Sequence, residues 1–327
     1  MKQIEGFWAA RRVLVTGASG LVGSHLVAAL LSRSADITVL IRDQDPRSAL
    51  FRSGDIARVQ SVGGTLERVE DVERAIAESG CSVMFHLGAQ TIVGVGMQAP
   101  LMTFESNVRG TYNVLEACRR HAVDRLVLAS SDKAYGASDH PYTEEDPLLA
   151  RSPYDVSKAA GDLIAQGYHA SYASPLAILR CGNTYGGGDL NWSRLIPSTI
   201  RSFFKGQAPE IRSDGLYVRD YVYVADVVSA YCAVAEALDR PEVAGQAFNV
   251  AAGQDATVLE VVRTIAELIG GRLPEPQILN VTKGEIREQR LDTTKVRRVL
   301  GWSPKVSLRD GLGETIAWYR SYLGASE

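Results

Sequence analysis

A tyrosine and a lysine stand four residues apart near the middle of the chain, at Tyr154 and Lys158, in a stretch with a helical pattern. Residues at this spacing lie on one face of a helix. A phenol, whose ordinary pKa is about 10, is a poor base at neutral pH, but a nearby ammonium group stabilises its phenolate form. The pair therefore suits removal of a proton from an alcohol. A surface tyrosine beside a solvated lysine would show the same spacing, so this interpretation depends on other residues.

Three polar side chains, Ser131, Asp132 and Lys133, follow an apolar run that is typical of a buried strand. Catalytic groups gather at the carboxyl ends of strands in parallel sheets. Ser131 could hydrogen-bond the alcohol that Tyr154 deprotonates, which would make the two clusters parts of one site. Asp132 and Lys133 could instead be an ion pair in a turn, and both interpretations stay open here.

A glycine-rich turn follows the first apolar run and opens the first helical pattern. It reads Gly17-Ala18-Ser19-Gly20-Leu21-Val22-Gly23. Glycines let the chain turn sharply, let the backbone approach a pyrophosphate and let the helix pack on the strand. A tight turn without a ligand is the alternative, but the position at a strand–helix junction favours a dinucleotide cofactor.

The end of the second apolar run bears on which dinucleotide is bound. An acidic residue there would bind the ribose 2′-hydroxyl of NAD, but the run ends Leu40-Ile41-Arg42-Asp43. The guanidinium of Arg42 suits a 2′-phosphate, which favours NADP. Arg42 could also stack on adenine or face solvent, and Asp43 could still serve NAD.

Alternating strands and helices must position these residues. The expected strands are continuous apolar runs, as in a parallel sheet covered on both faces: Val13–Thr16, Ile37–Ile41, Val83–Leu87, Leu126–Ser130 and Leu176–Arg180. The expected helices between them are Val22–Leu31, Val72–Ser79, Phe104–His121 and Tyr154–Tyr172, with Val258–Ile269 and Leu312–Tyr322 later in the chain. This order predicts a Rossmann-like doubly wound sheet over residues 1–182 and about 217–247. A smaller α/β domain is expected over 183–216 and 248–327.

Composition excludes several other classes. The 327 residues carry a net charge of −3 and give a pI near 6.0, so no global basic field attracts nucleic acid. The four cysteines stand singly and no zinc spacing occurs, which predicts no metal site. Residues 1–12 lack a signal-peptide core and no apolar run is long enough for a membrane span. We therefore expect a cytoplasmic protein that does not bind membranes.

Seven motifs together resemble those of the extended short-chain dehydrogenase/reductase family, in the family's order and over nearly the whole chain. They are the glycine turn, His86-Leu-Gly-Ala-Gln90, Asn107-Val-Arg-Gly-Thr111, Ser130 to Gly136, Tyr154 with Lys158, Arg180-Cys-Gly-Asn-Thr-Tyr-Gly186 and Val218-Arg-Asp-Tyr-Val222. The resemblance is to the nucleotide-sugar 4,6-dehydratase and epimerase group. Phe7-Trp8, the Ser-Asp-Lys triplet and Gly186-Gly-Gly-Asp-Leu190 look most like CDP-glucose 4,6-dehydratases.

The resemblance implies a role for each matching residue. Tyr154 would be the base on the sugar 4-hydroxyl, Lys158 would lower its pKa and bind the nicotinamide ribose, and Ser131 would bond the 4-oxygen. Asp132 would protonate the departing 6-hydroxyl, and Lys133, which would need a depressed pKa, would be the C5 base in place of the glutamate of dTDP-glucose enzymes. The further cofactor-binding positions would be Leu87, Ala89 and Asn107. The substrate would meet Gln90, and its diphosphate would meet Asn183 and Arg219, with Arg194 as a further candidate. Arg287 would contact the nucleotide, because Thr282-Lys-Gly-Glu285 replaces the usual Arg-Pro-Gly-Asp.

The implied reaction is a net dehydration of a nucleotide-diphosphate sugar. Hydride leaves C4 for the cofactor, water is lost across C5–C6 and hydride returns to C6. A C4 epimerase is the main alternative, since epimerases use the same tyrosine and lysine but need no acid–base pair beside Ser131. A catalytically silent dinucleotide-binding module is a third.

Two long helical segments also predict the oligomeric state. Phe104–His121 and Tyr154–Tyr172 carry apolar residues on more than one face. In the resembling family such helices pair across a two-fold axis into a four-helix bundle, so we expect a homodimer. The alternative is that both helices simply cover the sheet.

Overall fold

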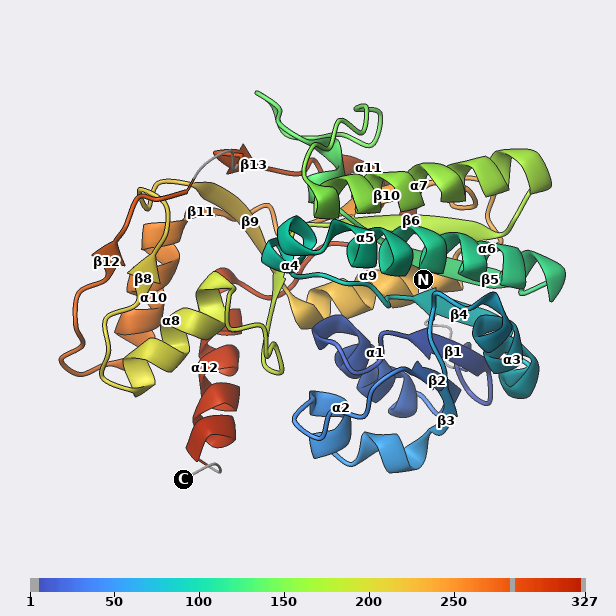
Figure 1. Ribbon diagram of the computed structural model, residues 1–327, viewed down its shortest axis with the longest axis horizontal. Coiled ribbons are helices and arrows are strands. Elements are labelled where there is room, and N and C mark those ends of the chain that lie inside the picture. Colours follow the sequence, from blue (N-terminus) through green and yellow to red (C-terminus); the bar gives the residue numbers. More distant parts are fainter. Residues whose placement is uncertain (1–5, 283–285, 325–327) are drawn as a thin grey trace.

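The computed structural model describes residues 6–282 and 286–324 (Figure 1). Within them, seven parallel strands form one large sheet in the order β10-β6-β5-β4-β1-β2-β3. These strands are β1 (Arg12–Thr16), β2 (Asp36–Ile41), β3 (Gln60–Gly63), β4 (Val83–His86), β5 (Arg125–Ser131), β6 (Leu176–Cys181) and β10 (Ala247–Val250). The order reverses between β1 and β4, which is where a doubly wound sheet binds its ligand. The expected Rossmann-like fold is confirmed.

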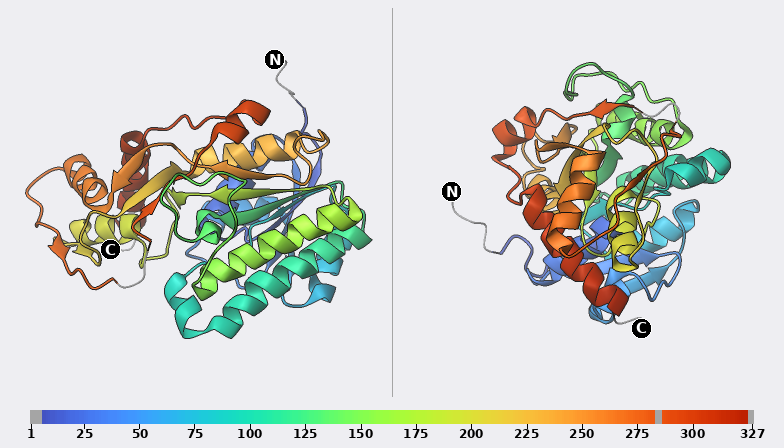
Figure 2. Two further views of the ribbon diagram at one scale, coloured as in Figure 1. Left: turned by 90° about the horizontal axis from the view of Figure 1, so that it is seen from above. Right: turned by 90° about the vertical axis from the view of Figure 1, so that its left-hand side faces the viewer.

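Helices cover both faces of the large sheet, which is why its central strands are largely apolar. Figure 2 shows α6 (Gly110–Arg120) and α7 (Pro153–Tyr172) side by side on one face and α9 (Val224–Glu236) on the other. The core with α9 also contains α1 (Leu21–Leu31), and the core with α6 and α7 also contains α3 (Val69–Ser79). The remaining helices of this part are α2 (Ala49–Arg52), η1 (Asp55–Arg58), α4 (Val93–Gln98), α5 (Pro100–Phe104), η2 (Glu105–Arg109), η3 (Asp132–Tyr135) and α11 (Thr294–Leu300).

A smaller second part lies beside the carboxyl edge of the large sheet (Figure 1). Its strand β9 (Val218–Tyr223) pairs with β7 (Asn183–Tyr185), β11 (Asp255–Thr257) and β13 (Glu288–Gln289), and β8 (Glu210–Ile211) pairs with β12 (Gln277–Ile278). A separate core, with Ile200, Val261 and Ile316 fully or almost fully buried, joins α8 (Leu195–Phe204), α10 (Val258–Ile269) and α12 (Leu308–Gly324) to this sheet.

Two strands lie in a different sheet from the one expected. β9 belongs to the second sheet, although residues 217–247 were assigned to the dinucleotide domain. β10 lies at the edge of the large sheet, paired with β6, although it was assigned to the second domain. The chain runs from β9 through α9 into β10, so the change from one sheet to the other falls inside a single strand–helix–strand unit. The division into two domains at these boundaries stays a prediction.

Element ends differ by a few residues from expectation, mostly at helix starts. The helix expected from Phe104 begins at Pro100, and the one expected from Val72 begins at Val69. Helices α8 and α9 were not expected, because loops and scattered aromatic residues surround them in the sequence.

A buried ion pair ties α7 to the large sheet. The guanidinium Nε of Arg180, on β6, lies 2.9 Å from a carboxylate oxygen of Asp162, on α7, and both side chains are almost completely shielded from solvent. Removing one member of a buried pair leaves an uncompensated charge. We therefore expect Arg180→Met to lower the free energy of unfolding in urea by about 3–5 kcal/mol. Arg309→Met, which removes an exposed pair with Glu267, should stay near wild type, and equal behaviour of the two variants would contradict the prediction.

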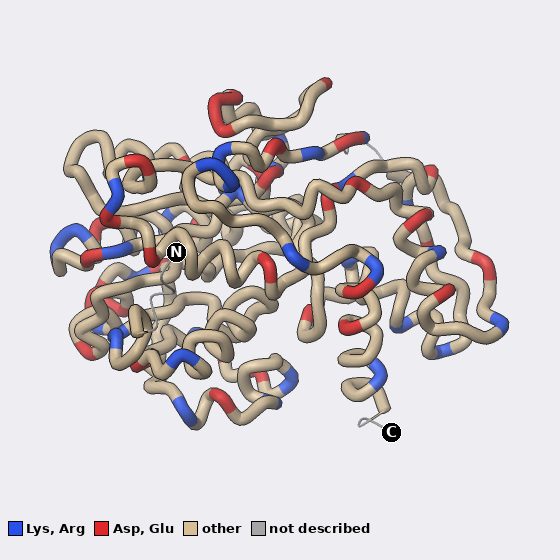
Figure 3. Tube along the Cα trace, turned by 180° about the vertical axis from the view of Figure 1, so that it is seen from behind, with Lys and Arg blue, Asp and Glu red and all other residues tan. Residues whose placement is uncertain are grey.

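Basic and acidic residues are interspersed along the chain (Figure 3). In the described part of the chain, no helix is long and apolar enough to cross a membrane.

Candidate active site

The predicted catalytic residues come from two neighbouring elements at the carboxyl edge of the large sheet. Ser131 is the last residue of β5, and Asp132 and Lys133 begin the short helix η3. Tyr154 and Lys158 lie in the first two turns of α7, which Ser152 caps by accepting a hydrogen bond from the Asp155 backbone. Both clusters expected from the sequence therefore meet at one edge.

The Ser131 hydroxyl organises the start of η3. It accepts a hydrogen bond from the Lys133 backbone at 3.2 Å and donates one to Asp132 Oδ1 at 3.1 Å. The Lys133 ammonium lies 3.6 Å from the same carboxylate oxygen and donates to Gln289 Oε1 at 3.4 Å. Asp132 is buried, with 3% of its surface exposed, whereas Lys133 is partly exposed. An acid and an amine thus lie in contact beside the serine.

The phenol of Tyr154 is buried next to this pair. Burial raises the pKa of Tyr154 to about 12, the positive charge of Arg194 and a hydrogen bond from Ser131 oppose that rise, and Asp132 reinforces it. Ser131, Asp132 and Arg194 thus all lie close enough to this phenol to affect its pKa. Arg194, expected among the diphosphate ligands, is the strongest cationic influence on this phenol.

Lys158, one helical turn after Tyr154, contacts the end of β5. Its ammonium donates to the backbone carbonyl of Ala129, near the end of β5, at 2.5 Å. Burial lowers the pKa of Lys158 to about 8, opposed by the negative charge of Asp162. The lysine is on the same helix face as the tyrosine, but its proton is directed to β5.

Asn107 lies in η2, a wide π turn that joins α5 to α6. Its side-chain amide accepts from the Gln90 backbone N–H at 2.7 Å and donates to the Gln90 carbonyl and the Ser157 hydroxyl, both at 2.9 Å. Such turns interrupt helices frequently at functional sites. Asn107, expected as a cofactor-binding or water-holding residue, here fastens the loop after β4 to α7, next to Leu87 and Ala89.

Gln90, expected to touch substrate, uses its side chain locally. Its amide nitrogen donates to the Ile92 carbonyl and the Thr103 hydroxyl, both at 3.1 Å, and its amide oxygen accepts from the Ile92 backbone. The substrate role predicted for it would require these bonds to be exchanged.

The glycine turn fits a dinucleotide pyrophosphate. A Cβ at Gly17 would lie 2.6 Å from the Gly88 nitrogen, and one at Gly23 would lie 2.1 Å from the Gly17 oxygen. The backbone therefore packs too closely at these two positions for side chains. The N-cap of α1, Gly20, supplies no capping side chain, so the helix N-terminus beside Ser19, Leu21 and Val22 is suited to an anion.

This packing makes the glycine turn sensitive to one methyl group. Gly17 also has φ of +70°, a conformation that alanine adopts at a cost. We expect Gly17→Ala to weaken dinucleotide binding at least about 10-fold, since a strain of 1–3 kcal/mol is placed on the loop that holds the phosphates. Calorimetric titration with NAD and NADP measures this. Gly54→Ala, at a surface glycine of similar φ with no atom near a Cβ, controls for strain alone.

Arg42, the basis of the expected NADP preference, is exposed at the end of β2. Its Nε lies 2.6 Å from Asp43 Oδ2, and about two thirds of each side chain is exposed. The two residues that were expected to favour different dinucleotides thus neutralise each other.

The expected diphosphate contacts lie around the second sheet. Asn183, at the start of β7, has a buried amide nitrogen that no acceptor among the described residues meets. Arg194 is paired with Asp189 at 3.0 Å. Arg219 and Arg287 both approach the ring of Tyr217, and Arg287 also pairs with Asp214 at 3.2 Å. Residues 283–285, within the tetrapeptide that replaces Arg-Pro-Gly-Asp, lie outside the described residues.

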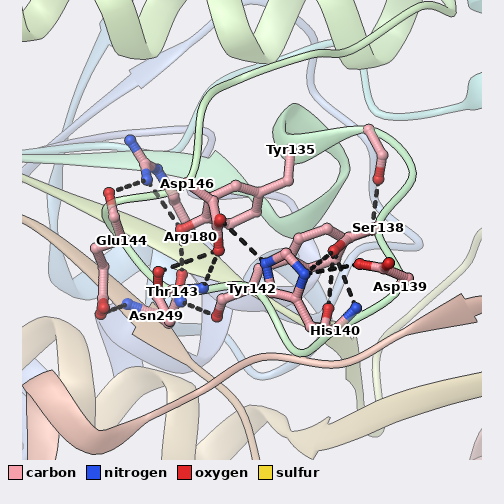
Figure 4. Close-up of polar contacts among 11 residues, drawn as sticks. Tyr135, Ser138, Asp139, His140, Tyr142, Thr143, Glu144, Asp146, Arg180 and Asn249 are labelled. Atoms are coloured by element: carbon pink, nitrogen blue, oxygen red, sulfur yellow. Dashed lines mark hydrogen bonds and ion pairs between the residues drawn. The ribbon is translucent and has the colours of Figure 1, made fainter.

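The loop after η3 is held against β6 and β10 of the large sheet, as Figure 4 shows. The rings of Tyr135 and Tyr142 stack 4.8 Å apart, and Tyr135 donates to Asn249 Oδ1 at 2.7 Å while accepting from Arg180. The Asn249 backbone donates to Glu144 at 2.7 Å. These contacts hold the position of η3, and with it Asp132 and Lys133.

Several residues at the site were not expected from the sequence. Gln289 contacts Lys133 from 156 positions away. Asp155, next to Tyr154, has a buried carboxylate oxygen without a described partner, and burial raises its pKa, opposed by a hydrogen bond from Ser152 and the charge of Lys133. The Ser130 hydroxyl is similarly buried and unpaired among the described residues. No spacing in the sequence marks these residues. Among residues 6–282 and 286–324, no group of three or more His, Cys, Asp or Glu side chains could hold a metal ion.

Comparisons with known proteins agree with this geometry. The model of the NAD dependent epimerase/dehydratase family matches residues 13–251. A dTDP-glucose 4,6-dehydratase of Streptomyces griseus is 32% identical over 317 residues, covering 95% of this chain and 94% of the relative.

Two solved structures are similar over nearly their whole length. DesIV, a dTDP-glucose 4,6-dehydratase from Streptomyces venezuelae with NAD and TYD bound, has a TM-score of 0.88 at 30% identity, covering 96% of this chain and 98% of its own. UDP-glucose 4-epimerase from Thermotoga maritima with UDP-glucose has a TM-score of 0.87 at 28% identity, covering 95% and 99%. The chain therefore belongs to the NAD dependent epimerase/dehydratase family, the nucleotide-sugar group of the extended short-chain dehydrogenases.

Proposed function

We propose that the protein is a nucleotide-sugar 4,6-dehydratase. The observation that carries this proposal is the contact between Asp132 and Lys133, 3.6 Å apart, beside Ser131 and the buried phenol of Tyr154. Dehydration across C5–C6 needs an acid for the departing hydroxyl and a base for the C5 proton. Epimerisation at C4 needs neither group.

Each side chain would have one task in this reaction. The bound dinucleotide would accept hydride from C4 and return hydride to C6. Tyr154 takes the proton of the sugar 4-hydroxyl, and Ser131 donates a hydrogen bond to the same oxygen. Asp132 as the carboxylic acid donates a proton to the leaving 6-hydroxyl, and Lys133 as the neutral amine removes the C5 proton, which the 4-ketone has made acidic. Return of a proton from Lys133 to Asp132, which lie in contact, restores both groups. Lys158 would leave the Ala129 carbonyl for the cofactor's ribose.

The nucleotide base of the substrate stays a prediction with two candidates. The Ser131-Asp132-Lys133 triplet resembles that of CDP-glucose enzymes, whereas the relatives from S. griseus and S. venezuelae are named for dTDP-glucose. Asn183, with its unpaired buried amide, and Arg219, on the neighbouring strand, are the residues that we assign to the diphosphate.

For the cofactor, we propose NAD rather than NADP. This replaces the preference for NADP that Arg42 suggested, because the guanidinium is already paired with Asp43 and the S. venezuelae structure contains NAD. Denaturing the purified protein and identifying the released dinucleotide by mass tests the proposal. Release of NADP would reverse it.

A C4 epimerase is the second candidate, favoured by the close structural similarity to the T. maritima enzyme. Incubation with CDP-, dTDP-, UDP- and GDP-hexoses separates the two. Loss of one water from the sugar nucleotide, seen by mass spectrometry, supports the dehydratase. Unchanged mass with altered sugar stereochemistry supports the epimerase and overturns our proposal.

We also propose a homodimer formed through α6 and α7. Leu101 and Met102, on α5, which continues through η2 into α6, and Leu163, on α7, are each more than half exposed. Exposed apolar side chains on one face are typical of an interface. Light scattering should give a mass about twice 35.4 kDa, and a particle of the monomer's mass would refute the dimer. A cytoplasmic location remains an expectation.

A further inference from the structure

One side chain of the second sheet reaches the acid–base pair. Gln289, on β13, is 3% exposed, and its Oε1 accepts the hydrogen bond from Lys133 Nζ. β13 runs parallel to β9, with Gln289 opposite Arg219 in the register. Gln289 therefore joins the strand that carries a proposed diphosphate ligand to the end of the large sheet.

The other half of this amide has no partner. Gln289 Nε2 is buried, and no acceptor in the described ranges 6–282 and 286–324 meets it. An ammonium only donates, so the amide oxygen must face Lys133 and the NH2 group must point elsewhere. Buried donors are nearly always paired in native proteins, and an unpaired one calls for an explanation.

We propose that Gln289 binds the hexose of the substrate and positions Lys133 for it. Its NH2 group donates to a sugar oxygen, while its carbonyl oxygen accepts a hydrogen bond from Lys133 Nζ. The neutral amine form of Lys133 keeps N–H groups for this bond and has a lone pair for the C5 proton. This inference rests on the proposed function, because it takes Lys133 as the group that faces C5.

The neighbours of Gln289 favour the hexose over the diphosphate. The group that it contacts is Lys133, which lies 3.6 Å from Asp132, and both belong beside C5 and C6 of the reacting sugar. Anionic oxygens are better matched by guanidinium groups, and Arg219 is the neighbour that supplies one. A neutral amide suits an uncharged hydroxyl or ring oxygen.

Binding measurements test this contact without relying on catalysis. Wild type, Gln289→Met and Gln246→Met are titrated with CDP-glucose and dTDP-glucose, and with CDP and dTDP alone. Gln246 is the matched control, because it accepts a hydrogen bond from Lys295 at 2.9 Å away from the site. We expect Gln289→Met to bind the preferred nucleotide glucose about 10-fold more weakly than wild type, which corresponds to the loss of one hydrogen bond in a buried site. Its affinity for the nucleoside diphosphate alone should be unchanged. Equal affinities of Gln289→Met and wild type for the sugar nucleotide would overturn the contact.

The positioning of Lys133 has its own readout. In a single turnover, Gln289→Met should still form reduced cofactor, seen by its absorbance, but should lose water about 10- to 100-fold more slowly, because a displaced base reacts poorly. Gln246→Met should match wild type in both steps. A normal rate of water loss in Gln289→Met would refute the positioning role. Loss of both steps with an unchanged melting temperature would also refute it, since the effect would then not be confined to the acid–base pair.

A charged variant covers the case in which Gln289→Met does not fold. Gln289→Glu keeps an oxygen toward Lys133 but adds a negative charge, which favours the protonated lysine. The pH at which water loss reaches half its maximal rate should therefore rise relative to wild type, and an unchanged midpoint would contradict the proposal. If wild type removes water from none of the nucleotide hexoses, the proposed function fails, while the binding titrations still decide whether Gln289 contacts the sugar.

Discussion

Replacing Tyr154 with phenylalanine is expected to lower kcat/KM for the nucleotide sugar about 10²- to 10⁴-fold, the usual range for loss of a general base. The hydroxyl is buried, and its oxygen is the proton acceptor in the proposed mechanism. Phenylalanine fills the same space, so the melting temperature should change little. Steady-state kinetics with the preferred sugar nucleotide measure the loss.

Tyr172→Phe is the matched control, because this exposed tyrosine lies on the same helix, far from the β5 end. It should keep full activity. Activity of Tyr154→Phe within a few-fold of wild type would remove the tyrosine from the mechanism, and an equal loss in Tyr172→Phe would indicate a general disturbance of α7.

The pH dependence of the wild-type rate, and its absence in Tyr154→Phe, follow from the protonation state of the phenol. Burial raises the pKa of Tyr154 to about 12, so the hydroxyl is protonated at neutral pH. A base works after losing its proton, so the wild-type rate should increase with pH. A cation brought near the oxygen would lower this pKa and move the increase toward neutral pH. Tyr154→Phe should lack this rising limb.

The sequence predicted the fold and the meeting of two catalytic clusters for one physical reason. Parallel strands place their carboxyl ends at a common edge, so residues that follow Ser130 and residues that open the helix at Pro153 must come together. The glycine turn could also be predicted from the sequence. Glycine is required at Gly17 because its backbone packs against Gly88, just after β4, and at Gly23 because its backbone packs against Gly17.

Contacts between segments far apart in the sequence could not be predicted. β13 is placed beside η3 by its pairing with β9, which involves only two residues of each strand. A strand this short has no periodicity that could be recognised in the sequence. The partner of Lys158 was also missed, because spacing places a lysine on a helix face but does not choose between a phenol and a backbone carbonyl such as that of Ala129. Asn107 was noticed as a polar residue in an apolar helix, but its bonds to Gln90 depend on a π turn that the sequence does not reveal.

Replacing Asp132 with asparagine is expected to separate the two halves of the reaction. Asparagine has the same shape and can still accept the hydrogen bond from Ser131 through its amide oxygen, so hydride transfer from C4 should continue. It has no acidic proton for the leaving 6-hydroxyl. Water loss should therefore fall about 10²- to 10⁴-fold, the contribution typical of a general acid, and reduced cofactor should accumulate.

Stopped-flow absorbance of the reduced cofactor and the mass of the product follow the two halves in one sample. Asp139→Asn, on the exposed loop that follows η3, should behave as wild type in both. If Asp132→Asn loses water at the normal rate, the acid lies elsewhere, and Asp155 becomes the next residue to test because its unpaired carboxylate is the nearest in sequence to Tyr154. If reduced cofactor fails to form, Asp132 supports Ser131 and Tyr154 instead of the leaving group. The dehydratase assignment therefore predicts that Asp132→Asn still transfers hydride from C4 but no longer loses water. An epimerase would not need Asp132 for either step.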